Sequence, residues 1–269
     1  MGLQTEEHLV PVWKAEPTLI EVSYVRPPAA IDIDRRQSWP RRFRASVEEW
    51  ATSLRGTAQD TCDLRIPLDE EDRFRSETSS YLFRTYHCTR LLDHEVLAIR
   101  QAGLQLLSED LVGSRIEDAV THGFLGRPEG DALAASSVFA RGEQEHREGQ
   151  ICLILSHHPL KTEPYGVWRL LATWGGEAIY FNHERTPLEG ALRSLGRPTV
   201  VVADIDLSEG WRRHPVYPGV LHSLVGRRLG FEDHGSDVFY RAPIPASQIA
   251  AIWQPGQPEY DRYPELPRN

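Results

Sequence analysis

The residues best suited to chemistry lie in Tyr86-His87-Cys88-Thr89-Arg90, directly before an amphipathic segment that ends in Gly103-Leu104. The aromatic residues of 81–87 favour a strand. A polar imidazole and a hydroxyl at the end of a short apolar strand are placed to contact whatever lies beyond it. We therefore expect a ligand-binding strand end at these residues.

Two later segments supply an aromatic ring and an acidic group. The turn Trp174-Gly175-Gly176-Glu177 leads into Ala178-Ile179-Tyr180-Phe181, which we expect to be a strand that presents Tyr180. Asp237-Val238-Phe239-Tyr240 predicts a further strand that begins with a carboxylate. An imidazole, a phenol and a carboxylate from distant parts of the chain are thus predicted to line one pocket.

These three segments, in this order, resemble the ADP-ribosyltransferase superfamily. The likeness is to its His-Tyr-Glu branch, and within it to DNA-modifying toxins, whose opening strand reads Tyr-His-x-Thr and whose next helix closes in Gly-Leu. It spans about residues 84–253. The resemblance implies that NAD is the substrate, that His87 hydrogen-bonds NAD, and that Thr89 supports the strand end. It also implies that Tyr180 stacks on nicotinamide, and Arg90 could pair with the pyrophosphate through its planar fork.

The acidic residue departs from the family pattern. The family's last strand carries a Glu, followed by alternating apolar residues, an Ile-Pro or Val-Pro turn and an Ile; residues 237–249 follow this order but begin with Asp237. Such a carboxylate stabilises the oxocarbenium-like state in which the nicotinamide–ribose bond breaks. Asp is one methylene shorter, and a displacement of about 1 Å can cost ~10²-fold in rate. Glu177, beside two glycines, and Glu232 are the alternative catalytic acids.

The pattern of elements predicts an α+β fold, with split mixed β-sheets and flanking helices as the resemblance implies. We expect an N-terminal extension or covering layer over 1–80 and an ADP-ribosyltransferase-like domain over 81–269. Local signals predict helices near 46–54, from Asp93 to Gly103, from Ser108 to Gly123 and from the capping box 186–189 to Gly196. Strands are expected at 151–155 and 199–205, a charged loop at 69–72, and an irregular tail from 255.

Composition excludes several classes of protein. Apolar residues make up 40% of the chain and charged residues 26%, as in ordinary globular proteins. No apolar run approaches the roughly 20 residues that span a bilayer, and the acidic N-terminus lacks a signal-peptide segment. Cys62, Cys88 and Cys152 are too dispersed for a disulfide framework or a zinc motif. We therefore expect a cytoplasmic protein with no membrane partner.

Nucleotide and metal motifs of other folds are missing. The sequence has no GxGxxG, GxxxxGK[ST], GxSxG or HExxH pattern, and His157-His158 would point to opposite faces of a strand, so no metal site is expected. The net charge of −9 opposes broad attraction to nucleic acid. The basic run 35–44, with Trp39 and Phe43, is either a single-stranded nucleic-acid contact or a solvated face with two anchoring aromatics.

Three functions stay open from the sequence. The first is a mono-ADP-ribosyltransferase, such as a bacterial toxin or defence effector, that transfers ADP-ribose to a protein or nucleic-acid acceptor. The second is a module of the same fold that binds a nucleotide without turnover. The third is a structural or partner-binding domain over 81–253, in which Trp174 and Trp253 are core or interface anchors.

Overall fold

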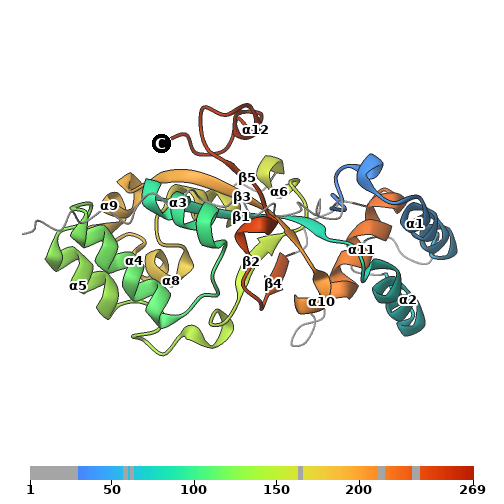
Figure 1. Cartoon of the computed structure of the whole chain (residues 1–269), viewed down its shortest axis with the longest axis horizontal. Helices are drawn as coiled ribbons and strands as arrows, with labels where there is room; N and C mark the ends of the chain where they lie inside the picture. Colours follow the sequence, from blue (N-terminus) through green and yellow to red (C-terminus); the bar gives the residue numbers. More distant parts are fainter. Residues whose placement is uncertain (1–29, 57–59, 61–63, 163–165, 211–215, 232–236) are drawn as a thin grey trace, which may run out of the picture.

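A five-stranded antiparallel sheet runs through the described part of the molecule and, with the helices around it, confirms the α+β class (Figure 1). The computed structural model describes residues 30–56, 60, 64–162, 166–210, 216–231 and 237–269. Its strands are β1 Phe83–Leu91, β2 Ile151–Ile154, β3 Arg197–Ile205, β4 Asp237–Tyr240 and β5 Ile249–Trp253, in the order β4-β2-β1-β3-β5. We expected split mixed sheets. Instead every pairing between these strands is antiparallel, and β1 joins the two sides because it pairs with both β2 and β3.

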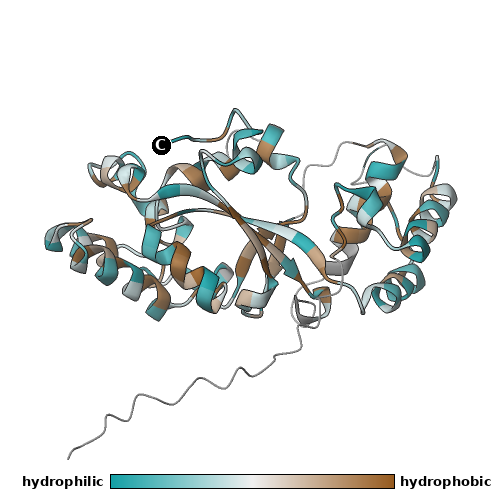
Figure 2. Cartoon of the chain, turned by 45° about the horizontal axis from the view of Figure 1, so that its top comes forward, coloured by the Kyte–Doolittle hydropathy of each residue, from teal (hydrophilic) through white to brown (hydrophobic). Residues whose placement is uncertain are grey.

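Helices gather at the two ends of the sheet (Figure 1). One group comprises α3 Asp93–Ala102, α4 Glu109–Thr121, α5 Arg127–Ala135, α8 Glu177–Tyr180 and α9 Leu188–Ser194, and the other comprises α1 Arg41–Ser53, α2 Leu68–Thr78 and α11 Val216–Leu229. Shorter helices are α6 Pro159–Thr162, α7 Gly166–Ala172, α10 Leu207–Gly210 and α12 Pro258–Asp261, and 3-10 turns lie at Arg36–Ser38, Gln144–His146, Phe181–His183 and Ala246–Gln248. The strands between these groups carry both hydrophobic and hydrophilic residues, and hydrophilic residues are prominent on the helices at both ends (Figure 2).

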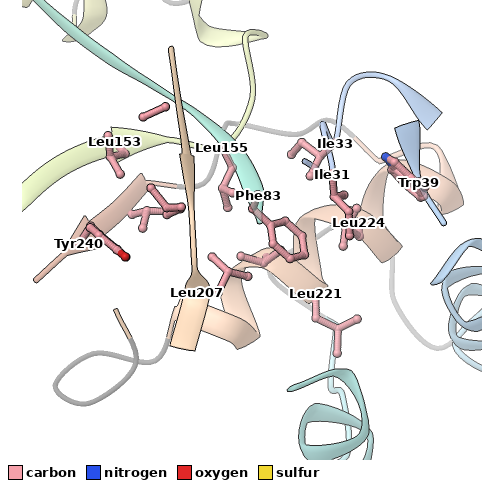
Figure 3. Close-up of a cluster of buried hydrophobic side chains, with 14 of the residues drawn as sticks. Ile31, Ile33, Trp39, Phe83, Leu153, Leu155, Leu207, Leu221, Leu224 and Tyr240 are labelled. Carbon is pink, nitrogen blue, oxygen red and sulfur yellow. The ribbon is translucent and has the colours of Figure 1, made fainter. Parts of the chain in front are cut away.

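The largest hydrophobic cluster joins the N-terminal helices to the sheet. Phe83 and Leu155 from the strand region face Ile31 and Leu224 in this cluster (Figure 3). Ile31 also bridges Phe83 in parallel, with its backbone N–H 2.8 Å from the Leu82 carbonyl oxygen. The described residues of the predicted 1–80 layer therefore share one core with the sheet. The division of the chain at residue 80 stays a prediction.

The local helix signals mostly give the observed helices. Ser108 caps α4 by accepting a hydrogen bond from the Leu111 N–H at 3.1 Å, and Gly103 follows α3 at φ +85°. The charged loop expected at 69–72 is wrong, because these residues form the first turns of α2. Acidic groups in a first turn interact favourably with the positive end of the helix dipole. The tail also differs from expectation, since α12 lies within it.

Both aromatic residues of the basic run 35–44 are buried. Trp39 and Phe43 are 8% and 1% exposed, and the indole N–H of Trp39 donates to the Asp32 carbonyl oxygen at 2.7 Å. Their rings are therefore not available to stack on bases. The run comprises a 3-10 turn and the first turn of α1, and its two aromatics anchor it, as the simpler interpretation of the sequence predicted.

Candidate functional site

A pocket of about 620 Å³, here called the site pocket, lies between β1, β2 and helices α3 and α4. Its wall is largely apolar and includes Leu91, Ile99, Leu104, Leu107, Val167 and Leu170. Small-molecule sites commonly measure about 300–1,000 Å³ and combine apolar walls with a few polar groups. The site pocket has both properties.

The pocket begins where β1 and β2 separate. Along these two strands one register pair joins them, Tyr86 opposite Ile154, whereas β1 and β3 pair over all nine residues of β1. At the next position the His87 imidazole bonds the Cys152 backbone instead, with Nδ1 2.8 Å from the carbonyl oxygen. A carbonyl oxygen only accepts, so Nδ1 carries the proton. In the neutral ring Nε2 is then an acceptor.

The surroundings of His87 favour this neutral form. Burial lowers the pKa of the imidazole, and the positive charge of Arg115 lowers it further, while the bond to Cys152 opposes both. His87 therefore stays uncharged near pH 7. Thr89, two residues along β1 and so on the same face, also lines the pocket and is 5% exposed. The predicted pair His87 and Thr89 thus share one wall.

Two of the three predicted acids open onto the same pocket. Glu177 begins α8 after the Gly175-Gly176 turn, and Asp237 begins β4 opposite Ile154 of β2. Gly176 adopts φ +64°, which glycine tolerates at the sharp turn that starts α8. Glu232 lies outside the described residues.

The thiol of Cys152 lies close enough to both carboxylates to be affected by their charges. Its withdrawal from bulk water, followed by the charges of Glu177 and Asp237, raises the pKa of Cys152 to about 11. Cys152 also opens onto the pocket. The carboxylates of Glu177 on α8 and Asp237 on β4 therefore both interact electrostatically with the Cys152 thiol in the pocket wall.

Glu177 has a cationic partner. Arg147, another pocket residue, lies with Nη2 3.1 Å from the Glu177 Oε2, and its guanidinium lies 5.6 Å from the centre of the Phe181 ring. Both side chains are partly exposed, so a ligand can compete for either charge. No local sequence signal pointed to Arg147, because it follows a short 3-10 turn far along the chain from α8.

Tyr180 does not reach the pocket. Residues 178–181 form the end of α8 and a 3-10 turn, so the predicted strand is wrong. Tyr180 is 1% exposed in a hydrophobic cluster with Ile179 and Trp174, and it is not part of the pocket wall. A four-residue apolar run does not distinguish a buried strand from a buried helix. Nicotinamide stacking by Tyr180 is therefore not possible in this arrangement.

Arg90 also lies outside the pocket wall. Its guanidinium is buried and donates to backbone oxygens of Leu195 at 2.5 Å and Asn269 at 2.6 Å, and burial lowers its pKa. Arg90 is three residues after His87, and an odd separation places side chains on opposite faces of a strand. Because its N–H groups bind these backbone oxygens and it is not part of the pocket wall, Arg90 does not make the predicted contact with a pyrophosphate in this arrangement.

A buried ionic cluster that the sequence did not predict forms another wall. Glu95 of α3 accepts three hydrogen bonds: from the Leu92 N–H at 2.7 Å, Arg115 Nε at 2.6 Å and Trp174 Nε1 at 2.9 Å. Burial favours the neutral acid, but Arg115 and the other donors together hold the pKa of Glu95 below its usual value. Glu95 is therefore ionised. The Glu three residues into a helix predicts a cap, but nothing local predicts partners 20 and 79 residues away.

The remaining candidates from the sequence lie elsewhere. His157 is directed to Asp34, with Nε2 3.5 Å from Oδ2. Trp174 and Trp253 are 0% and 9% exposed, so both are core residues. Within the described ranges, no group of three or more His, Cys, Asp or Glu side chains is placed to hold a metal ion.

Comparison with protein-family models, curated proteins and solved structures gave no match. None of the helices in the described part of the chain is both long and apolar enough to cross a bilayer. The functional argument therefore depends on the pocket itself.

Proposed function

We propose that the site pocket binds NAD and that the protein is an NAD-dependent mono-ADP-ribosyltransferase. The observation that carries the proposal is the shared pocket: His87 and Thr89 from β1, Glu177 from α8 and Asp237 from β4 all line it.

The residues have complementary tasks in this reaction. The bond between C1′ of the ribose and the nicotinamide nitrogen breaks, its electron pair leaves with nicotinamide, and positive charge develops on the ribose. An ionised carboxylate beside that ribose stabilises the charge in a site with little water. Neutral His87 orients the ribose with Nε2 as acceptor, since Nδ1 is committed to Cys152. A nucleophile of the acceptor then bonds to C1′ and loses its proton.

Glu177 and Asp237 compete for the role of the carboxylate. Glu177 has the longer side chain and directly follows the Gly175-Gly176 turn, and its ion pair with Arg147 favours the ionised carboxylate. Asp237 occupies the strand position at which the resembled family carries its acid. Each is tested separately, because both open onto the pocket.

Release of nicotinamide from labelled NAD tests the proposal. The measurement is made with added single-stranded DNA, RNA and a protein mixture, so that the acceptor class is identified in the same assay. We expect His87→Ala and one of Glu177→Gln or Asp237→Asn to slow release about 10²-fold or more. Glu184→Gln is the matched control for Glu177: it removes another arginine-paired glutamate, 2.6 Å from Arg169, outside the pocket. No release from the unmodified protein with any acceptor would rule out the activity.

A second candidate function is nucleotide binding without turnover. Two observations favour it: Tyr180 is absent from the pocket wall, and Glu177 is engaged by Arg147. Calorimetry that shows NAD binding to the unmodified protein, together with no nicotinamide release, would select this function. A toxin or defence role and a cytoplasmic location stay predictions from the sequence.

A further inference from the structure

Arg115 is held firmly in the wall of the site pocket. Its Nε donates to Glu95 Oε1 at 2.6 Å, and its guanidinium carbon lies 5.1 Å from the centre of the Trp174 ring. Its side chain is 20% exposed. A carboxylate at one edge and an aromatic face therefore fix the plane of the guanidinium before any ligand arrives.

Most of the hydrogen-bonding capacity of Arg115 is unused. A guanidinium has five N–H donors, and in the described structure Nε–H alone has a protein acceptor. Nη2 is buried without a partner. A buried, unpaired donor on a charged group is costly, so a site that retains one is suited to an acceptor supplied from outside the protein.

The negative charge of Glu95 is shared among three donors. The Leu92 N–H and Trp174 Nε1 bind Oε2, and Glu95 lies in the first turn of α3, where the helix dipole favours a negative charge. Arg115 is the strongest of the partners that stabilise the charge of Glu95, and the other two donors contribute to it. The positive charge of Arg115 also acts at the pocket wall, where it lowers the pKa of His87.

The pocket wall carries two arginines, each beside a glutamate. Arg115 on α4 pairs with Glu95, and Arg147 pairs with Glu177 on α8. The two arginines differ in one respect: Nη2 of Arg147 is bonded to Glu177, whereas Nη2 of Arg115 has no protein acceptor. Of the two, Arg115 is therefore the better candidate for binding an anionic group of a ligand.

We propose that Arg115 is the anion-binding residue of the site pocket and that its guanidinium holds a diphosphate. The planar fork of arginine matches pairs of phosphate oxygens, which an ammonium group does not. The assignment to the diphosphate of NAD rests on the proposed function. The assignment of Arg115 to a diphosphate as such does not.

Calorimetry on the full chain tests the proposal with ADP, inorganic pyrophosphate and adenosine. We expect the unmodified protein to bind ADP at least about tenfold more tightly than adenosine, because charge-assisted bidentate bonds contribute more than one factor of ten. Arg115→Lys keeps the charge but loses the fork. It should remove about tenfold of this preference and leave adenosine affinity unchanged. Arg100→Lys is the control, because Arg100 is exposed on α3 outside the pocket wall.

Each outcome decides the matter. An unchanged ADP preference in a folded Arg115→Lys variant, or no binding of ADP and pyrophosphate by the unmodified protein, would overturn the proposal. If Arg115→Lys does not fold, a crystal structure of the unmodified protein with ADP decides instead. Diphosphate oxygens within hydrogen-bonding distance of the Nη atoms support the proposal, and a diphosphate bound elsewhere refutes it. ADP binding through Arg115 without nicotinamide release would refute the transferase activity alone.

Discussion

Gly103 offers the sharpest test of how the pocket is built. It ends α3 with φ +85° and ψ −165°, a region that is essentially restricted to glycine. A Cβ added at Gly103 would lie 1.8 Å from the Ile244 carbonyl oxygen and 2.7 Å from the Pro245 carbonyl carbon. Both obstacles are backbone atoms, so no side-chain rotation relieves the collision. Gly103 and Leu104 line the site pocket, and Leu104 bridges Ile244.

The expected cost of Gly103→Ala follows from two separate effects. Holding a residue other than glycine in this backbone conformation costs about 1–3 kcal/mol. Moving the chain at 244–246 to make room costs about 1–3 kcal/mol more, by analogy with overpacked cores. We therefore expect a loss of about 2–6 kcal/mol in the free energy of unfolding. The measurement is urea unfolding followed by tryptophan fluorescence, with the midpoint and slope compared between proteins.

Gly123→Ala is the matched control. Gly123 also follows a helix, at φ +74°, but an added Cβ meets nothing within 4 Å. The control should lose only about 1–2 kcal/mol from the left-handed conformation. Gly103→Ala should also weaken ligand binding to the pocket, and the control should not. Equal losses for the two variants, within about 0.5 kcal/mol, would refute the argument that the close approach to Ile244 limits this position.

Three further predictions concern the polar groups of the pocket. Alkylation of Cys152, followed by mass spectrometry across a pH series, should report a thiol pKa of about 11. Glu177→Gln should lower this pKa, because one nearby negative charge is removed. An unchanged pH profile in this variant would show that the Glu177 carboxylate is too far from the Cys152 thiol to affect it. Trp174→Phe should lower the free energy of urea unfolding by about 1–2 kcal/mol, since Glu95 loses one donor. The folded pKa of Glu95 is depressed, so its stabilising contribution is present above its unfolded pKa and lost as the pH falls through the folded value. The stability difference between the unmodified protein and Glu95→Gln should accordingly shrink in acid, and a constant difference from pH 7 to pH 3 would contradict this.

Local chemistry in the sequence predicted most of the long elements. Ser108 and Gly103 mark helix ends because a cap and a left-handed residue are properties of a few neighbouring residues. The apolar run 199–205 became the fully paired β3. At the capping box the contacts differ in detail: Thr186 Oγ1 accepts from the Leu188 N–H at 3.3 Å, and Glu189 accepts from the Arg185 N–H at 2.6 Å.

The errors arise where short segments depend on their tertiary surroundings. The residues Ala178, Ile179 and Tyr180 are all buried, so their apolar character fits either a strand or a helix. The error at Arg90 has another cause. Side chains alternate along a strand, so the sequence alone already indicated that Arg90 points to the face opposite His87. The pairing of Glu95 with Arg115 and Trp174 had no local signal, since the fold alone brings α3, α4 and the turn before α8 together.

The site pocket lies where three hydrophobic clusters meet, and this explains why its shape depends on polar contacts. Leu91 and Leu104 belong to the cluster shared with the N-terminal helices, Ala178 to the cluster around Trp174, and Val167 to the cluster beneath β1. Leu170 packs against two of the clusters and also lines the pocket. The other contacts around the pocket are directional: the His87 bond to Cys152 and the Glu95 network. Substitutions inside a cluster should therefore change mainly stability, whereas substitutions in these polar contacts should change the geometry of the pocket at a smaller cost in stability.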